Sequence, residues 1–120
     1  HTTTGDALFA GIPVISLEGK NFASRVSGGL LRASGLSELI CPSIEAYIAK
    51  AIELLKDPIK LKNIKMHLLQ NRSKLYAFNA PLRTLQIEAA FLAAQDRADK
   101  GLPPEHITIQ VKHKKKDQVA

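Results

Sequence analysis

Three threonines and an aspartate precede an apolar run at the beginning of the sequence. Residues 1–14 read His-Thr-Thr-Thr-Gly-Asp-Ala-Leu-Phe-Ala-Gly-Ile-Pro-Val. Such residues are typical of a helix start, because a threonine oxygen can accept a hydrogen bond from a free backbone N–H. The same N–H groups, the helix dipole and the hydroxyls can also bind an anion such as a nucleotide diphosphate. We therefore predict a helix at 3–10, with Asp6 in its first turn, where the dipole favours a carboxylate. Simple capping explains the same residue types.

A strand, a helix and a second strand are expected to follow this segment. Gly11 should end the first helix, and β-branched residues then predict a buried parallel strand. The expected elements are a strand at 12–16, a helix at 22–34 and a strand at 38–41. This is a βαβ unit, for which a right-handed crossover is expected. The loop at 17–21 would lie at the edge where open α/β sheets bind ligands.

Three further helices are predicted, at 43–56, 58–76 and 81–100, because prolines and a candidate cap at Ser43 separate three apolar stripes. The stripes comprise Ile44, Tyr47, Ile48, Ala51, Ile52 and Leu55, then Leu61, Ile64, Leu68 and Leu69, then Leu82, Leu85, Ala89 and Leu92. Two short strands make a poor sheet. We therefore expect partner strands upstream of this sequence.

Three blocks of the sequence resemble a known enzyme family. Residues 1–14, Phe-Ala-Ser-Arg-Val at 22–26 and Gly-Leu-Ser-Glu-Leu-Ile at 35–40 resemble the C-terminal part of glycosyltransferase family 41, the O-GlcNAc transferase and SPINDLY group. The resemblance implies an α/β chain that forms the C-terminal part of a Rossmann-like lobe of a GT-B glycosyltransferase, with short parallel strands followed by three helices. Together with the pattern of the sequence, it leads us to expect three parts. These are a partial βαβ segment with the donor-phosphate site at 1–41, C-terminal helices of the same lobe at 42–110 and a basic flexible tail at 111–120.

The resemblance also implies roles for individual residues. Thr2 and Thr3 match threonines that contact the phosphates of the donor, and Asp6 matches an acidic residue on a ribose hydroxyl. His1 matches the motif histidine, which either approaches the nucleotide or shapes the turn. Thr4 stands where relatives vary, so it is only a further candidate.

Other side chains give weaker indications. Arg25 could clamp a phosphate, although we favour a structural salt bridge for it. Cys41 is expected to be a buried, inert thiol, and His67 a surface or interface residue. No general base can be named. No histidine or cysteine has metal-ligand spacing, so we expect no metal and no cofactor other than the donor substrate.

The function implied by the resemblance is inverting transfer of N-acetylglucosamine from UDP-GlcNAc to Ser or Thr of proteins. The implied partners are the nucleotide sugar, a protein acceptor, and an upstream lobe and tetratricopeptide repeats of the same chain. A SPINDLY-type transfer of fucose from GDP-fucose and a non-catalytic helical interaction module are the alternatives. We expect the 120 residues alone to be inactive, because a GT-B site lies between two lobes.

Composition restricts the other classes of function. The 120 residues are 45% hydrophobic, which favours a folded domain. The formal charge of +6 is concentrated in a lysine-rich tail. No aromatic residues alternate with these lysines, so nucleic acid is an unlikely partner. The sequence has no apolar run long enough to span a membrane. Its single cysteine fits a reducing compartment, and we expect a cytoplasmic protein.

Overall fold

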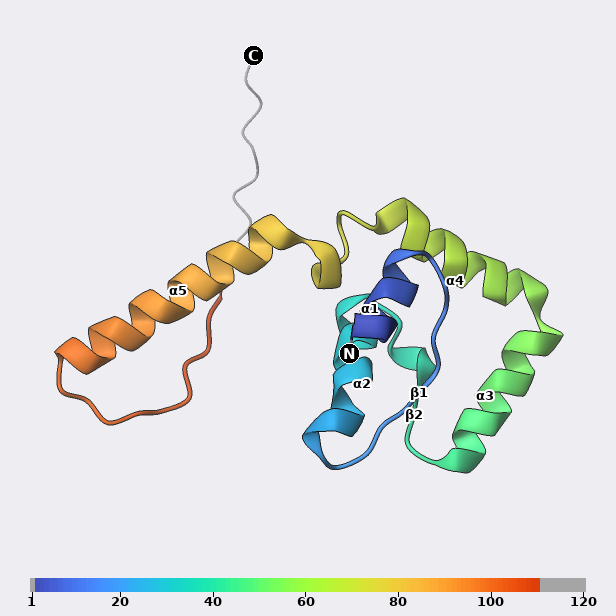
Figure 1. Ribbon diagram of the computed structural model, residues 1–120, viewed down its shortest axis with the longest axis horizontal. Coiled ribbons are helices and arrows are strands. Elements are labelled where there is room, and N and C mark those ends of the chain that lie inside the picture. Colours follow the sequence, from blue (N-terminus) through green and yellow to red (C-terminus); the bar gives the residue numbers. More distant parts are fainter. Residues whose placement is uncertain (1, 111–120) are drawn as a thin grey trace, which may run out of the picture. The chain divides into compact units, whose positions relative to one another are not determined.

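The computed structural model describes residues 2–110, which form two compact units that divide between Phe78 and Asn79. The first unit holds a small parallel sheet and four α-helices (Figure 1). Its elements in order are α1 (Thr2–Phe9), β1 (Ser16–Leu17), α2 (Phe22–Ala33), a 3-10 helix (Ser37–Leu39), β2 (Ile40–Cys41), α3 (Ile44–Lys56), α4 (Pro58–Asn71) and a second 3-10 helix (Tyr76–Phe78). The second unit holds α5 (Ala80–Asp99). The architecture is mostly helical and is compatible with the predicted α/β class.

The sheet of the first unit pairs β1 and β2 in parallel, with Ser16 opposite Ile40 and Leu17 opposite Cys41. The prediction of parallel strands around a helix is confirmed, but both predicted strands were too long. Residues 12–15 are not in a strand, and the first half of the second predicted strand is a 3-10 helix. β-branched residues favour an extended backbone, whereas a strand also needs a hydrogen-bonded neighbour. Among residues 2–110, that neighbour is present for two residues of each strand.

Glycines end α1 and α2, as predicted. Gly11 has a φ of +80° and Gly35 a φ of +72°, a region that L side chains rarely adopt. In each case the N–H of the following residue donates to a carbonyl five positions earlier, at 2.8 Å for Ile12 and 2.9 Å for Leu36. These bonds form Schellman motifs, which satisfy the last carbonyls of the helix.

The core of the first unit consists mainly of leucines from α1, α2, α3 and α4. Its buried side chains are Leu8, Leu31, Leu36, Leu39, Leu54, Ile64, Leu68 and Leu75. The predicted stripe of α4 is confirmed in part, because Ile64 and Leu68 are buried. The predicted apolar stripe of α3 is largely exposed in the described part of the chain. Leu54 is the buried residue of this helix, whereas Ile44 is 61% and Leu55 79% exposed.

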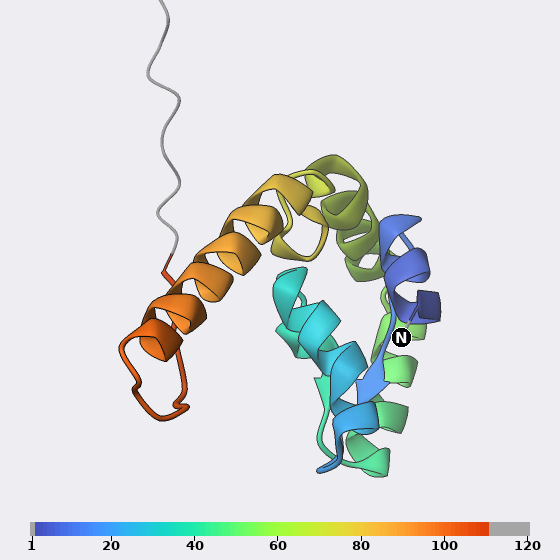
Figure 2. The same ribbon diagram turned by 60° about the vertical axis from the view of Figure 1, so that its left-hand side comes forward.

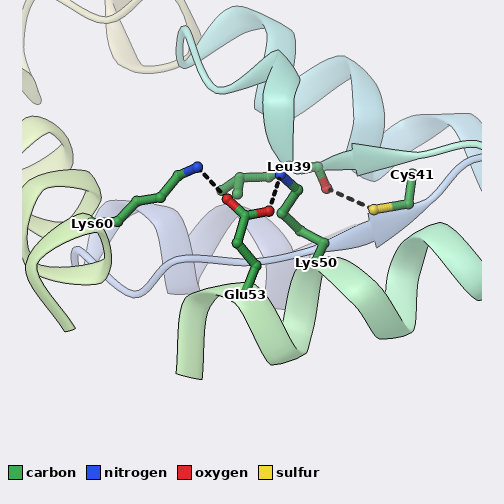
Figure 3. A network of polar contacts seen from close by, with 5 residues as sticks. All are labelled: Leu39, Cys41, Lys50, Glu53 and Lys60. Carbon is green, nitrogen blue, oxygen red and sulfur yellow. Dashed lines mark hydrogen bonds and ion pairs between the residues drawn. The ribbon is translucent and has the colours of Figure 1, made fainter. Parts of the chain in front are cut away.

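The helices α3 and α4 are joined by capping bonds and a polar network. Ser43 caps α3 as predicted, because its side chain accepts from the N–H of Ala46 at 3.2 Å. Asp57 accepts from the N–H of Lys60 at 2.9 Å and caps α4, which ends at Asn71, earlier than predicted. Figure 3 shows Glu53 of α3 between two lysines, with one oxygen bonded to Lys60 of α4 and the other 2.7 Å from Lys50. These two hydrogen bonds lower the pKa of Glu53 to about 2.

The second unit is a helix with a short segment folded back along it. Asn79 caps α5 by accepting from the N–H of Leu82 at 3.1 Å. Arg97 donates to the carbonyl of Pro103 at 2.6 Å and pairs with Glu105 at 2.5 Å. None of the residues of α5 is buried, so its predicted apolar stripe is not covered in the described part of the chain. None of the helices described between residues 2 and 110 has the length and apolarity required to cross a membrane. The predicted flexible tail at 111–120 lies outside the described residues.

Candidate functional site

The helices α2 and α3 both start at one edge of the sheet of the first unit. In a parallel βαβ arrangement each strand runs into a loop, and the next helix starts beyond the carboxyl end of that strand. Figure 2 shows α2 and α3 starting on the side to which the strands run. Ligands of open α/β sheets bind at this edge. That the threonine segment at the start of α1 binds the donor phosphates stays a prediction.

The threonines occupy the first turn of α1. The helix begins at Thr2, one residue earlier than predicted, so the expectation of a threonine before the helix was wrong. The preceding residue, His1, lies outside the described residues. Thr2 and Thr3 are exposed. The first N–H groups of a helix have no partner inside the helix. Two exposed hydroxyls therefore stand beside free backbone donors.

Thr4 has a different environment from its two neighbours. It is half-buried, and its Oγ1 lies 3.0 Å from the Oγ of Ser27 on α2. This bond links α1 to α2 and engages the hydroxyl within the fold. The structure therefore distinguishes Thr4 from the exposed Thr2 and Thr3. In the sequence, this distinction rested on the family resemblance alone.

Asp6 lies in the second turn of α1, so its predicted first-turn position was wrong. The helix starts one residue earlier than expected, and no acidic residue stands in its first turn. Because Asp6 follows Thr2 by four positions and Thr3 by three, all three side chains lie on neighbouring parts of the helix surface. Its carboxylate is exposed and lies on the same side of α1 as the two free hydroxyls.

The loop after β1 is held by an ion pair that the sequence did not predict. Arg32 donates two hydrogen bonds to Glu18, from Nη1 to Oε1 at 2.8 Å and from Nη2 to Oε2 at 2.5 Å. Hydrogen bonding from Arg32 holds the pKa of Glu18 below its usual value, and the charge of Arg25 lowers it further. Arg25 itself is exposed and forms no ion pair with any residue from 2 to 110, so the salt bridge favoured for it has no partner in the described part of the chain.

Gly28 makes this ion pair sterically feasible. A Cβ at this position would lie 2.5 Å from Oε1 of Glu18 and 3.3 Å from Nη1 of Arg32. Gly28 therefore allows the close approach of Glu18 to α2. The adjacent Gly29 has no such role, because a Cβ there would meet no atom within 4 Å.

A hollow of about 440 Å³ lies directly beyond the ends of both strands. It is lined by Glu18, Gly19 and Lys20 after β1, Pro42 after β2, and Arg32, Ser37 and Ile40. Cations, a carboxylate and a hydroxyl in one open hollow suit a polar ligand with anionic and hydroxyl groups. Only the loop at 17–21 was predicted to belong to this edge, because the other lining residues come from segments that are distant in sequence.

Two residues considered as weaker candidates have structural roles. Cys41 is buried, as predicted, and is 2% exposed. His67, expected as a surface or interface residue, is half-buried, and its Nε2 lies 2.9 Å from the carbonyl oxygen of Ser34. It thereby fastens α4 to the end of α2. Between residues 2 and 110, no group of three His, Cys, Asp or Glu side chains could hold a metal ion. Independence of a metal stays a prediction.

The two parallel strands with α2 between them form a βαβ segment, as in α/β proteins. The helices α2 and α3 start at the carboxyl ends of these strands, the edge at which such proteins bind ligands. The chain belongs to glycosyl transferase family 41, whose sequence model matches residues 1–87. The family resemblance carried by the threonine motif is thereby confirmed.

Curated relatives match over most of this chain. It is similar to the probable UDP-N-acetylglucosamine--peptide N-acetylglucosaminyltransferase SEC of Arabidopsis thaliana, with 31% identity over 91% of this chain and 11% of the relative. The UDP-N-acetylglucosamine--peptide N-acetylglucosaminyltransferase of Caenorhabditis elegans is 29% identical over 90% of this chain and 9% of its own length. A probable enzyme of the same description, SPINDLY of Solanum lycopersicum, is 30% identical over 86% of this chain and 11% of its length. The chain thus spans about a tenth of the length of these relatives.

Proposed function

We propose that this chain is the donor-phosphate part of a glycosyltransferase that transfers N-acetylglucosamine from UDP-GlcNAc to Ser or Thr of proteins, with inversion. The observation that carries the proposal is the exposed pair Thr2 and Thr3 in the first turn of α1, beside backbone N–H groups that have no partner inside the helix. Membership of family 41 and the printed names of the relatives support the choice of reaction and donor.

The first turn of α1 has the chemistry that a departing nucleotide diphosphate requires. Negative charge grows on the diphosphate as the bond to the sugar breaks. Donors already oriented toward that charge stabilise the transition state more than the bound donor, and this difference accelerates the reaction. In our proposal the free N–H groups and the hydroxyls of Thr2 and Thr3 supply these donors, and His1 shapes or contacts the same site.

Asp6 and the nearby cations complete the proposed donor site. A carboxylate can accept hydrogen bonds from two adjacent hydroxyls, so Asp6 suits the ribose of the nucleotide. Arg25, exposed and without an ion pair among residues 2–110, is the candidate clamp for a phosphate. Thr4 contributes indirectly, by holding α1 against α2. No metal ion takes part in this proposal.

The remainder of the proposed enzyme is supplied by other parts. We propose a GT-B arrangement in which a second Rossmann-like lobe provides the base-binding and acceptor-activating residues. Tetratricopeptide repeats would then hold the acceptor protein. The described residues offer no candidate general base, so a catalytic residue is not assigned.

Calorimetric titration of the full-length protein with UDP tests the site. Thr3→Ala should weaken binding by about ten-fold, because a hydrogen bond to a charged group contributes about 1.5 kcal/mol or more. Asp6→Ala should also weaken UDP binding, and Asp6→Asn should recover part of the loss. Thr84→Ala is the matched control, because Thr84 is an exposed threonine on α5 that bonds to the carbonyl of Ala80.

The outcomes separate the three hypotheses. Unchanged UDP affinity in both the Thr3 and Asp6 variants would remove the assigned site and favour the interaction module. Protection of the full-length protein against heat by GDP rather than UDP would favour SPINDLY-type transfer of fucose. Loss of UDP binding in the Thr84 control as well would show that the variants act through folding.

A further inference from the structure

Arg72, the residue directly after α4, has a guanidinium group without an acceptor. Its Nε is buried and has no hydrogen-bond partner. Within residues 2–110, its side chain forms no hydrogen bond or ion pair. Buried polar groups in folded proteins nearly always have a partner, so one that lacks it needs an explanation.

Aromatic rings hold this guanidinium in place. Its Cζ lies 4.3 Å from the centre of the Phe9 ring, a cation–π contact. The Phe9 ring is in turn fixed by the edge of Phe78, with ring centres 5.4 Å apart and planes at 75°. These contacts occupy the flat face of the guanidinium and use none of its N–H donors. The donors are therefore oriented in advance but remain unpaired.

The guanidinium borders a hollow of about 360 Å³ in the first unit, where α1 packs against α4 (Figure 1). The hollow is lined by Phe9, Leu69, Gln70, Arg72, Ser73 and Phe78. Half of this lining is apolar or aromatic, and the rest is one cation and two uncharged polar side chains. It therefore suits a planar carboxylate carried on an aliphatic stem, since a strongly hydrated tetrahedral anion would lose water against apolar walls.

We propose that this hollow binds the acidic side chain of a protein segment, with its carboxylate on Arg72 and a neighbouring apolar residue on Phe9. The carboxylate would accept two hydrogen bonds from the terminal nitrogens, which match its planar geometry, and its negative charge would offset the positive charge that the buried, unpaired Nε shares. Phe9 is 49% and Leu69 38% exposed, so the surface around the cation is apolar and open. A free carboxylate would leave that surface in water, whereas a peptide would cover it and gain hydrophobic free energy.

Saturation-transfer NMR on the full-length protein tests this inference, because the method detects weak ligands of large proteins. The probes are the peptide acetyl-Ala-Leu-Glu-Leu-Ala-amide and its Gln analogue. The Glu peptide should bind about five-fold more tightly than the Gln peptide, as expected for a partly exposed ion pair. Arg72→Gln should abolish this preference, and Arg72→Lys should remove most of it, because an ammonium lacks the planar pair of donors.

Arg83→Gln on α5 is the matched control, because it removes the same charge elsewhere and should keep the five-fold preference. Equal binding of the two peptides, or a preference that survives in both Arg72 variants, would overturn the proposal. Displacement of the Glu peptide by equimolar acetate or inorganic phosphate would also overturn it, because the site would then be a site for free anions. Circular dichroism of each variant ensures that loss of binding is not loss of fold.

Discussion

The two adjacent glycines of α2 allow a test of how the loop beyond β1 is held. A glycine inside a helix is about 1 kcal/mol less favourable than alanine. A methyl group at Gly29 would meet no atom within 4 Å, so Gly29→Ala should gain the whole amount. A methyl group at Gly28 would lie 2.5 Å from Oε1 of Glu18 and must displace the ion pair of Glu18 with Arg32. Gly28→Ala should therefore stabilise α2 less than Gly29→Ala does.

Hydrogen exchange of backbone amides in α2, followed by mass spectrometry of the full-length protein, measures this difference locally. Gly29→Ala should slow exchange in α2 by about five-fold, the factor that corresponds to about 1 kcal/mol. Gly28→Ala should slow it by clearly less. In a Glu18→Ala background the obstacle is absent, so Gly28→Ala should regain the full five-fold effect.

The reasoning is refuted if Gly28→Ala and Gly29→Ala slow exchange equally while Glu18 is present. Equal effects would mean that the Glu18 side chain does not lie against α2, and that the hollow beyond the strands lacks its carboxylate. A Gly28→Ala effect that is the same in both backgrounds would lead to the same conclusion.

Three other predictions follow from the helix ends and the polar network. The fold lowers the pKa of Glu53 from 4.5 to about 2. The contribution of the Glu53 carboxylate to stability is therefore complete above pH 4.5 and is lost as the pH falls through about 2. In thermal unfolding followed by circular dichroism, the Glu53→Gln variant should lack this pH dependence. Gly11→Ala should destabilise the protein by about 1–2 kcal/mol or more, because Gly11 has a positive φ. Its effect on hydrogen exchange should exceed that of Gly101→Ala, because the new Cβ at Gly11 also meets Leu69, at 2.6 Å, whereas a Cβ at Gly101 meets no atom within 4 Å. Equal effects of the two substitutions would exclude the steric contribution. Asp57→Ala should cost about 1 kcal/mol, the usual effect of losing an N-cap, and should raise exchange in the first turn of α4, whereas Asp57→Asn should not.

The features that the sequence predicted well are local in origin. Gly11 and Gly35 end helices because of their backbone conformation, and Ser43 caps α3 through a bond to a residue three positions away. These causes act within one or two turns of helix, so residue types and spacing reveal them. The threonine motif was located by the same local logic, although the helix began one residue earlier than expected.

The features that the sequence did not predict depend on pairing over long distances. The ion pair between Glu18 and Arg32 joins a loop to the end of a helix, and the bond from His67 reaches the carbonyl of Ser34 across the core. Neither follows from periodicity, because each requires the packing of whole elements. The apolar stripe of α3 marks a hydrophobic surface correctly, but periodicity does not specify what covers it. In the described part of the chain, Leu55 on that surface is exposed.

The buried thiol at the end of β2 has a practical consequence. Cys41 is the only cysteine of the sequence. Its backbone carbonyl accepts a hydrogen bond from the N–H of Glu18 at 2.9 Å, which continues the ladder between the strands. Figure 3 shows its Sγ directed at the carbonyl of Leu39. An alkylating reagent can reach this sulfur only while the packing around it opens. The rate of alkylation at Cys41, measured by peptide mapping, therefore reports how often this part of the fold opens. A slower rate in the presence of a nucleotide would show that the ligand makes local opening rarer.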